Sequence, residues 1–212
     1  MGIWIRDLMK NGKFIITSYF TYETPYSDVC HKYLMPSIAG LNLHADIRGV
    51  SNKGSWQRNT SYKPEFLKIM LEHHEEDVVF VDSDAEILAY PSLFNEIPDQ
   101  YIIAVHVLDK NVWYGRNYAT GRYELLSGTL WVKNCDESRK LLDAWESACN
   151  ATNMWEQKVL QTVLEQLGIK PYQLPLSYCY IKTMPNGQLP RVKVDRPVIV
   201  HSQISRSLKN KV

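Results

Sequence analysis

The sequence lacks several features that identify whole classes of protein. Its four cysteines include no C-x-x-C pair, which argues against a zinc knuckle or a thioredoxin-like redox site. Its longest apolar stretches have the length of a strand and fall well short of the ~20 residues that cross a membrane. Basic and acidic side chains nearly cancel, with 24 Lys and Arg against 23 Asp and Glu. The net charge of +1 therefore indicates neither a nucleic-acid nor a membrane partner.

The first residues carry no recognisable targeting signal. Arg6, Asp7 and Lys10 interrupt residues 1–13, so no apolar run reaches the length of a signal peptide. Gly2 does not begin a myristoylation signal, because Arg6 stands where Ser or Thr is expected. We therefore expect a cytoplasmic protein (in the host cytoplasm if it is viral) with free thiols and no membrane span. The sequence leaves the oligomeric state open.

The remaining composition is typical of one globular domain that spans residues 1–212. Apolar residues make up 45% and charged residues 22%, close to the averages for such domains. Strand-like apolar segments lie at residues 13–19, 43–50, 78–81, 101–107 and 125–132. Segments with helical spacing alternate with them, at residues 26–39, 63–73, 138–149 and 155–167. This alternation predicts a single α/β, Rossmann-like domain with a mainly parallel central sheet flanked by helices.

Two regions are expected to depart from regular structure. Pro36 should kink or end the helix of residues 26–39. Residues from 177 onward contain turn signals, such as the Pro-Asn-Gly of residues 185–187, and we expect them to be irregular.

The most informative segment is residues 78–87, Val-Val-Phe-Val-Asp-Ser-Asp-Ala-Glu-Ile. An apolar strand there ends in Asp82 and Asp84, at the edge where open α/β sheets bind ligands. Residues two apart in an extended chain point to the same side, so both carboxylates can reach one divalent cation. Such hard oxygen ligands suit Mg²⁺ or Mn²⁺. The plainer alternative is that one aspartate caps the strand end and the other lies in solvent.

Two classes of enzyme use an Asp-x-Asp strand of this kind. A haloacid-dehalogenase-like phosphatase would use the first aspartate as a nucleophile, but it favours Thr or Val where this chain has Glu86. Its motif also tends to lie near the N-terminus, whereas about 80 residues precede Asp82 here. A nucleotide-sugar transferase would use both carboxylates to hold the metal on a nucleotide diphosphate.

Five further segments between about residues 13 and 209 resemble a GT-A glycosyltransferase of the nucleotide-diphospho-sugar transferase type. They are Ile16-Thr-Ser-Tyr19, Trp56-x-x-Asn59-x-x-x-Lys63-Pro-x-Phe66-Leu, Leu126-Ser127-Gly128-Thr129, Trp155-Glu156-Gln157 and Ile199-Val-His201-x-x-x-Ser205-Arg206. The resemblance implies a GT-A fold and transfer of a sugar from a nucleotide-diphosphate donor, with UDP as the nucleotide. One departure is Glu156, which stands where Asp is more usual.

The resemblance also implies roles for individual residues. A Mn²⁺ or Mg²⁺ ion would be held by Asp82, Asp84 and His201, and because imidazole binds metal when neutral, activity should fall in acid. Residues expected to hold the nucleotide sugar, together with the two aspartates, are Thr17, Ser18, Tyr19, Lys63, Ser83, Ser127, Gly128, Arg206 and Lys209. Glu156 and Gln157 are expected to act catalytically near the reacting carbon of the sugar.

Several of these residues have a simpler structural alternative. Glu156 is favoured at a helix start by the helix dipole in any case, and Lys63 fits the first turn of a helix. A glycine within a strand, such as Gly128, is also found at bulges. His201 would be unremarkable as a strand residue. For Trp56, which could stack on a uracil base, we favour a place in the core.

The sequence does not specify the acceptor. Candidates are a surface glycan, a protein, or a hydroxymethylated base in phage-type DNA, which would have to be extruded from the duplex. Basic residues, Arg206 and Lys209 among them, are biased to the second half and could bind nucleic acid. A solvated surface explains the same bias more simply. The remaining alternative is a non-catalytic module that binds a nucleotide sugar or a nucleic acid.

Overall fold

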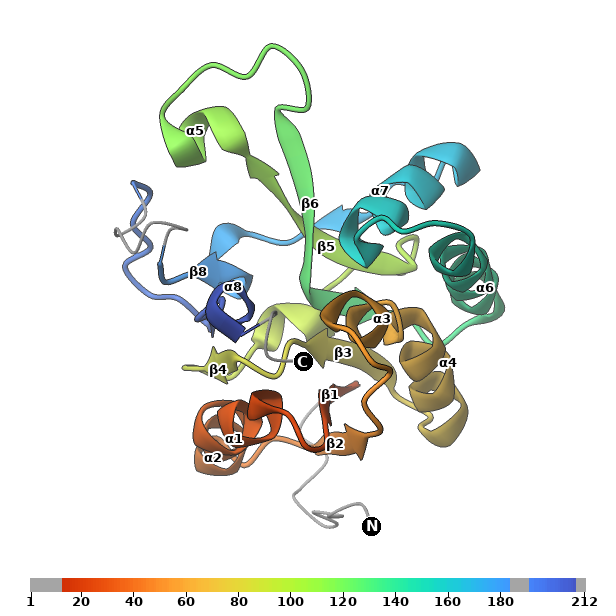
Figure 1. The fold of residues 1–212 in the computed structure, drawn as a ribbon, viewed down its shortest axis with the longest axis vertical. Helices are drawn as coiled ribbons and strands as arrows, with labels where there is room; N and C mark the ends of the chain where they lie inside the picture. Colours follow the sequence, from red (N-terminus) through yellow and green to blue (C-terminus); the bar gives the residue numbers. More distant parts are fainter. Residues whose placement is uncertain (1–12, 184–190, 209–212) are drawn as a thin grey trace.

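A six-stranded sheet forms the centre of the computed structural model, which describes residues 13–183 and 191–208 (Figure 1). Its strands are β1 (Phe14–Thr21), β2 (Ala45–Val50), β3 (Asp77–Val81), β5 (Ile103–Asp109), β6 (Tyr123–Val132) and β7 (Tyr172–Gln173). They lie side by side in the order β2-β1-β3-β6-β5-β7. β6 is antiparallel to β3 and β5, and the other neighbouring pairs are parallel. The predicted α/β fold with a mainly parallel sheet is confirmed.

Helices cover both faces of this sheet (Figure 1). α4 (Lys63–His73), α6 (Asp136–Ala151) and α7 (Glu156–Leu167) pack on one face, and α1 (Pro25–Lys32) and α2 (Leu34–Gly40) pack on the other. The shorter helices are α3 (Trp56–Thr60), α5 (Lys110–Tyr114) and α8 (Ser205–Leu208), with single turns η1 (Ser92–Asn95) and η2 (Leu176–Tyr178). Within the described residues, no helix combines the length and apolarity that crossing a membrane requires.

The wholly apolar sequence of β3 is explained by burial of both of its faces. Val78 and Phe80 join the core cluster beneath α4, α6 and α7, whereas Val79 and Val81 join the cluster beneath α1 and α2. Successive side chains of a strand point to opposite faces, so a strand with helices on both sides needs an apolar residue at every position. The polar residues that follow β3 therefore mark the point where the chain leaves the core.

A second, three-stranded sheet joins the middle of the chain to its C-terminal part. It contains β4 (Ala85–Ile87), β9 (Ile199–His201) and β8 (Tyr180–Ile181), in the order β4-β9-β8. β4 and β9 are antiparallel, and Ala85 pairs with His201. Because β4 starts directly after Asp84, this pairing brings His201 beside the residues that end β3.

The structure differs from the sequence prediction in two places. The helix predicted for residues 26–39 is divided at Tyr33, and Pro36 lies in the first turn of α2, where proline is tolerated. The C-terminal part, predicted to be irregular, contains η2, β8, β9 and α8. These elements are only two to four residues long, so they carry no periodic pattern. The cysteines are free, as expected, and three of the four are buried.

Candidate active site

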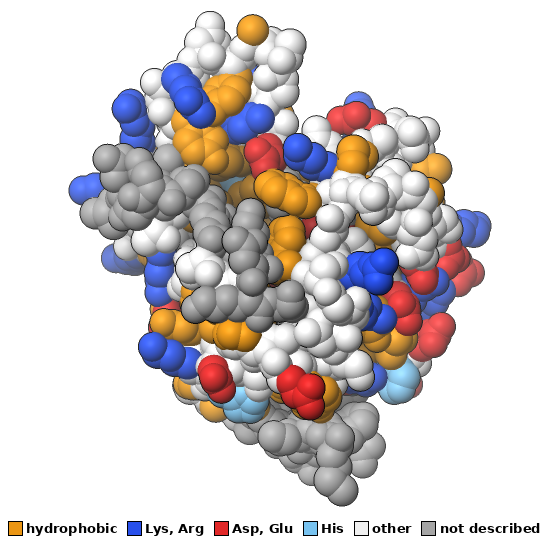
Figure 2. Space-filling view, viewed as in Figure 1, with side chains coloured by type: hydrophobic (Ala, Val, Ile, Leu, Met, Phe, Trp, Pro, Cys, Tyr) orange, Lys and Arg blue, Asp and Glu red, His pale blue; other side chains and the backbone are white. Residues whose placement is uncertain are grey.

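A cleft of about 660 Å³ opens where β1 and β3 end, at the edge where open α/β sheets bind ligands. Figure 2 shows this face hollowed, with hydrophobic side chains inside the hollow. The residues predicted for the site that line the cleft are Tyr19, Lys63, Asp82, Ser83, Asp84, Ser127, Gly128, Glu156, Gln157 and His201. The fold thus gathers side chains from six separate segments of the chain.

Asp82, Asp84 and His201 form a cluster that could hold a metal ion. Their ligand atoms all lie within 4.8 Å of one another. Asp84 and His201 are buried, with 8% and 4% of their surfaces exposed, whereas Asp82 is half-buried. The backbone N–H of Ile204 donates a hydrogen bond to Asp84 Oδ2 at 2.8 Å, so the C-terminal segment also fixes this carboxylate. Two carboxylates and an imidazole in this arrangement fit a divalent cation such as Mn²⁺ or Mg²⁺.

The orientation of His201 is set by contacts to both ring nitrogens. Nε2 lies 2.9 Å from Thr129 Oγ1, and Nδ1 lies 3.7 Å from Asp84 Oδ1. Burial disfavours the charged imidazole, but the neighbouring Cys179 and Asp84 outweigh burial and raise the pKa of His201 to about 10. A cation that binds Nδ1 must therefore displace a proton, so its affinity should fall as the pH is lowered.

Gly128 leaves open the space between the ligands of this cluster. The pairing of β5 with β6 shifts beside it, since Val105 pairs with Leu130 and His106 pairs with Leu126. The bulge considered from the sequence is therefore present. A Cβ atom at Gly128 would lie 3.1 Å from Asp82 Oδ2 and 3.1 Å from the His201 ring. The glycine thus permits close approach as well as a bulge.

Gly128→Ala should weaken Mn²⁺ binding by about 10- to 100-fold, the range found when the surroundings of metal ligands are disturbed. The added methyl group would press against Asp82 and His201. Isothermal titration calorimetry with Mn²⁺ measures the effect. Gly40→Ala is the matched control, because nothing lies within 4 Å of a Cβ atom at Gly40. Equal affinities of the wild type and Gly128→Ala would contradict this role of the glycine.

Lys63 is the buried cation of the site. Only 2% of its surface is exposed, and its Nζ donates to Asp82 Oδ1 at 3.1 Å and to Glu156 Oε1 at 3.0 Å. It also donates to the carbonyl oxygen of Ser127 at 3.0 Å. Burial lowers the pKa of Lys63, but the two carboxylates outweigh burial and raise the pKa to about 12. Lys63 is therefore charged at neutral pH and balances acidic residues from two distant segments.

Glu156 and Gln157 begin α7 beside Lys63. Ser127 Oγ donates to Glu156 Oε1 at 2.6 Å, so this oxygen accepts from both Ser127 and Lys63. Among the described residues no hydrogen bond uses Glu156 Oε2, which leaves that oxygen for a ligand. Gln157 Oε1 accepts from the backbone N–H of Ser127 at 3.1 Å, and its Nε2 donates to Glu124 Oε1 at 3.0 Å. Both side chains are thus held in place at the wall of the cleft.

The part of β1 that lines the cleft begins at Tyr19, two residues later than the sequence predicts. Thr17 and Ser18 are fully buried and do not belong to the lining of the cleft, whereas Tyr19 does. A role for Thr17 and Ser18 in nucleotide binding stays a prediction. Trp56, expected in the core, is half-buried and lines the cleft, and its ring lies 6.0 Å from that of Trp155.

Two predicted diphosphate contacts come from the C-terminal end. Arg206 belongs to α8, but its side chain is not among those that the structure describes. Lys209 lies outside the described residues. The roles of both stay predictions.

Three residues of the site were not predicted from the sequence. Tyr26 lines the cleft with its Oη buried, Thr129 contacts His201, and Glu124 accepts a hydrogen bond from Gln157. A signal existed for Thr129, because it belongs to the segment Leu126-Ser127-Gly128-Thr129 that carries the family resemblance. Tyr26 and Glu124 carried no such signal, since their places depend on how distant segments pack.

The fold matches solved glycosyltransferases. A glycosyltransferase involved in the glycosylation of the major capsid of PBCV-1 gives a TM-score of 0.64 at 15% identity and covers 92% of this chain and 95% of that chain. Apo GlyE of Streptococcus pneumoniae TIGR4 gives 0.60 at 15% identity, over 91% of this chain and 55% of that chain. Mouse xyloside xylosyltransferase 1 gives 0.57 at 8% identity, over 91% and 98%. At these identities the likeness establishes the GT-A fold alone.

Sequence comparison assigns the family. None of the curated proteins is similar enough to count as a relative. The sequence model of one family, described as nucleotide-diphospho-sugar transferase, matches residues 51–212. This range includes the Asp82 and Asp84 strand and His201, and the match favours a transferase over a phosphatase of the haloacid-dehalogenase type. The chain therefore belongs to the nucleotide-diphospho-sugar transferase family and is, as its sequence predicted, a glycosyltransferase.

Proposed function

We propose that this glycosyltransferase uses Mn²⁺ or Mg²⁺ and a UDP-sugar donor, and that it transfers the sugar to an acceptor hydroxyl. The acceptor is a surface glycan or a hydroxymethylated base of phage-type DNA. The enzyme acts as a single domain in the cytoplasm. The observation that carries this proposal is the cluster of Asp82, Asp84 and His201 in the same cleft as the buried Lys63 and Glu156.

The cluster has the chemistry to bind the metal of a nucleotide sugar. When bound, the cation would supply Lewis-acid stabilisation of the departing diphosphate. Lys63 donates to Asp82 Oδ1, so Asp82 Oδ2, which faces His201 across Gly128, is the oxygen available to the cation. Lys63 thereby orients the carboxylate as well as balancing its charge.

The rest of the cleft can bind the sugar and the base. Glu156 Oε2 can accept a hydrogen bond from a hydroxyl of the donor sugar, because Lys63 and Ser127 occupy Oε1. Because Lys63 and Ser127 hold Oε1, the Glu156 carboxylate is fixed in position and can orient the sugar. Tyr26 and Trp56, which also line the cleft, offer aromatic surfaces against which a uracil ring can pack.

Two considerations bear on the class of the acceptor. One solved neighbour is involved in the glycosylation of the major capsid of PBCV-1, which supports a surface glycan or a protein over DNA as the acceptor of this chain. A DNA acceptor would require a base to be extruded into the cleft and many phosphates to be neutralised.

A thermal-shift titration with UDP and Mn²⁺ tests the donor and the metal. Ligand at about 100 times its dissociation constant stabilises a protein by roughly 2.7 kcal/mol, which is about 5–10 °C for a chain of this size. UMP, which lacks the second phosphate, is the matched control and should shift the Tm much less. A UDP shift that survives EDTA would contradict the metal, and the absence of any shift would contradict the donor.

Catalysis is tested by release of UDP. Incubation with a panel of UDP-sugars and Mn²⁺, without acceptor, should release UDP slowly from one of them by transfer to water. This sugar is then the donor. Binding of UDP and Mn²⁺ without release from any UDP-sugar would instead support a non-catalytic binding module.

A further inference from the structure

The hairpin end, residues 110–122 between β5 and β6, projects from the body of the protein (Figure 1). Trp113 anchors it, since only 1% of this side chain is exposed and it packs in a small hydrophobic cluster with Leu108, Leu126 and Ile181. This cluster is separate from the two that cover the central sheet. The hairpin end is therefore a supported surface with a core of its own.

The outer side of the hairpin end carries tyrosines in contact with basic groups. The guanidinium of Arg116 lies 5.0 Å from the ring centre of Tyr118 and 5.7 Å from that of Tyr114. Its Nε also donates to Tyr118 Oη at 2.8 Å. Lys110 Nζ lies 4.9 Å from the same Tyr118 ring. Cation–π contacts of this kind hold the rings in place and put positive charge beside flat apolar surfaces.

The positive charge of this surface exceeds what its carboxylates neutralise. Asp109 accepts from Arg122 with a closest distance of 2.6 Å, and Glu124 lies 3.9 Å from Lys110. Arg116 is exposed, and no carboxylate in the described part of the chain forms an ion pair with it. Arg116 can therefore bind an anion of a ligand without breaking an ion pair within the protein.

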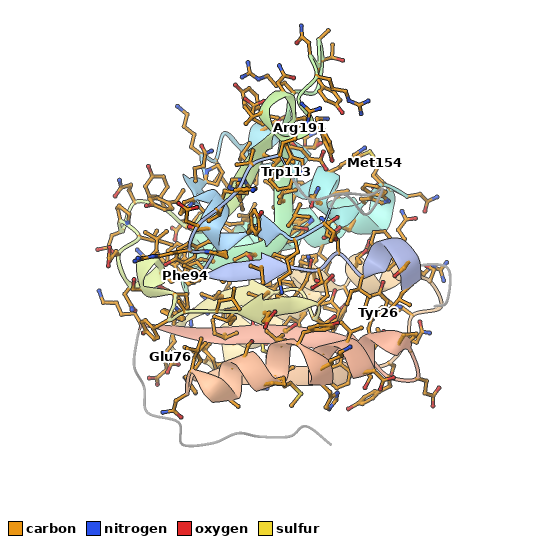
Figure 3. The ribbon with its side chains drawn as sticks, turned by 90° about the vertical axis from the view of Figure 1, so that its left-hand side faces the viewer. Tyr26, Glu76, Phe94, Trp113, Met154 and Arg191 are labelled. Carbon is orange, nitrogen blue, oxygen red and sulfur yellow. The ribbon has the colours of Figure 1, made fainter. Side chains whose placement is uncertain are left out.

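A second arginine reaches the same surface from the C-terminal part of the chain. The guanidinium of Arg191 lies directly against Gly115, which ends α5 in the left-handed conformation with a φ of 63°. Figure 3 shows Arg191 at the same end of the molecule as Trp113, and Figure 2 shows Lys and Arg side chains gathered there. Any side chain at Gly115 would displace Arg191, so the glycine allows Arg191 to lie against the end of α5, beside the backbone that leads to Arg116.

This surface is continuous with the sugar side of the cleft. Tyr114, Glu124 and Gln157 all line the cleft. Gln157 donates to Glu124, Glu124 lies beside Lys110, and Lys110 lies over the ring of Tyr118. A chain of contacts therefore leads from the start of α7 to the hairpin end. A molecule lying across the tyrosines can extend a terminal hydroxyl into the cleft.

We propose that the hairpin end binds the acceptor, and that the acceptor is an oligosaccharide bearing an acidic group, a carboxylate or a phosphate. Tyr114 and Tyr118 pack against the C–H faces of its sugar rings, and Arg116 binds the acidic group. This inference rests on the proposed transfer function and narrows its acceptor. It favours a glycan over DNA, because Asp109 pairs with Arg122 and Glu124 lies beside Lys110. Two cations that a strand of phosphates would need are therefore already neutralised.

A glycan microarray with neutral, carboxylated and phosphorylated oligosaccharides tests the proposal, with a short single-stranded DNA as competitor. We expect the wild-type protein to bind acidic oligosaccharides, and the carboxylated and phosphorylated spots identify which anion is preferred. Arg116→Ala should weaken this binding by roughly tenfold or more, the value of a charge-assisted hydrogen bond. Arg116→Lys should weaken it less, because the charge remains. Lys140→Ala, at an exposed lysine of α6, is the matched control and should bind normally.

The thermal shift with UDP and Mn²⁺, measured on the same variants, separates this proposal from the proposed function. Arg116→Ala should keep the full shift. Four results would overturn the acceptor assignment while leaving the donor site intact: no glycan binding, equal binding of neutral glycans, unchanged binding by Arg116→Ala, or displacement of the glycan by DNA at lower concentration. A wild-type protein that shows no UDP shift would overturn the proposed function, and the acceptor assignment with it.

Discussion

The Asp82→Asn, Asp84→Asn double variant should lose Mn²⁺-dependent UDP binding and should release UDP from its donor about a thousandfold more slowly than the wild type. The two carboxylates supply the oxygen ligands, and His201 alone is too weak a site for a hard cation. Loss of the metal removes several kcal/mol of stabilisation from the departing diphosphate, and about 4 kcal/mol corresponds to a thousandfold in rate. The thermal shift and UDP release measure the two effects separately.

The fold should survive this double change. Burial and the charge of Asp84 raise the pKa of Asp82, although the charges of Lys63 and His201 partly offset this rise. Without a metal, the two carboxylates therefore repel each other. Removing both charges relieves that repulsion, and Lys63 keeps its ion pair with Glu156. His201 can lose its proton once Asp84 no longer favours its charged form. Glu86→Gln is the matched control, because Glu86 follows Asp84 by two residues but pairs with Lys182 at 2.5 Å. Wild-type UDP release by the double variant would contradict the proposed metal site.

Lys63→Met should lower the free energy of unfolding by about 3–5 kcal/mol, the cost of leaving a buried ionic partner without its counter-charge. Glu156 is only 5% exposed and loses its cation, and Asp82 loses the contact that orients Oδ1. The pKa of Lys63, raised to about 12, means that the wild-type pair is intact at neutral pH. Urea denaturation at neutral pH measures the loss, and UDP release should fall as well.

Two comparisons separate the buried network from ion pairs in general. Lys68→Met lies on the same helix and breaks partly exposed pairs with Asp143 and Glu146, so it should cost only about 0–1 kcal/mol. Adding Glu156→Gln to Lys63→Met should restore part of the lost stability, because the unpaired charge is then gone. If Lys63→Met costs no more than Lys68→Met, the charge pairing of Lys63 has no structural importance.

The strand and the two aspartates that follow it were predictable because their signals are local. Asp82 and Asp84 follow an unbroken apolar strand, and the physics of a strand buried on both faces places them at the sheet edge. His201 was identified only through the resemblance to a family. Nothing in its own neighbourhood in the sequence shows that a three-residue strand will pair it with Ala85.

The charge network could not be predicted because it joins the first turns of two helices. Lys63 and Glu156 each fit a helix start on their own, and only the packing of α4 and α7 around Ser127 brings them within 3.0 Å. The burial of Thr17 and Ser18 in β1 was also not predictable. Both Thr17 and Ser18 look suitable for binding a polar ligand, but the helix layers bury them, and the strand reaches the cleft at Tyr19.

The small sheet couples the proposed cation site to the docking of the C-terminal segment. Asp84 adjoins β4, His201 ends β9, and the N–H of Ile204 also binds Asp84. A cation that bridges the two side chains would favour the paired state of β4 and β9, and by reciprocity the paired state would favour the cation by the same factor. The affinity of the proposed cation site should therefore depend partly on strand pairing, so substitutions at Ile199 or Val200 should change it without touching a ligand atom.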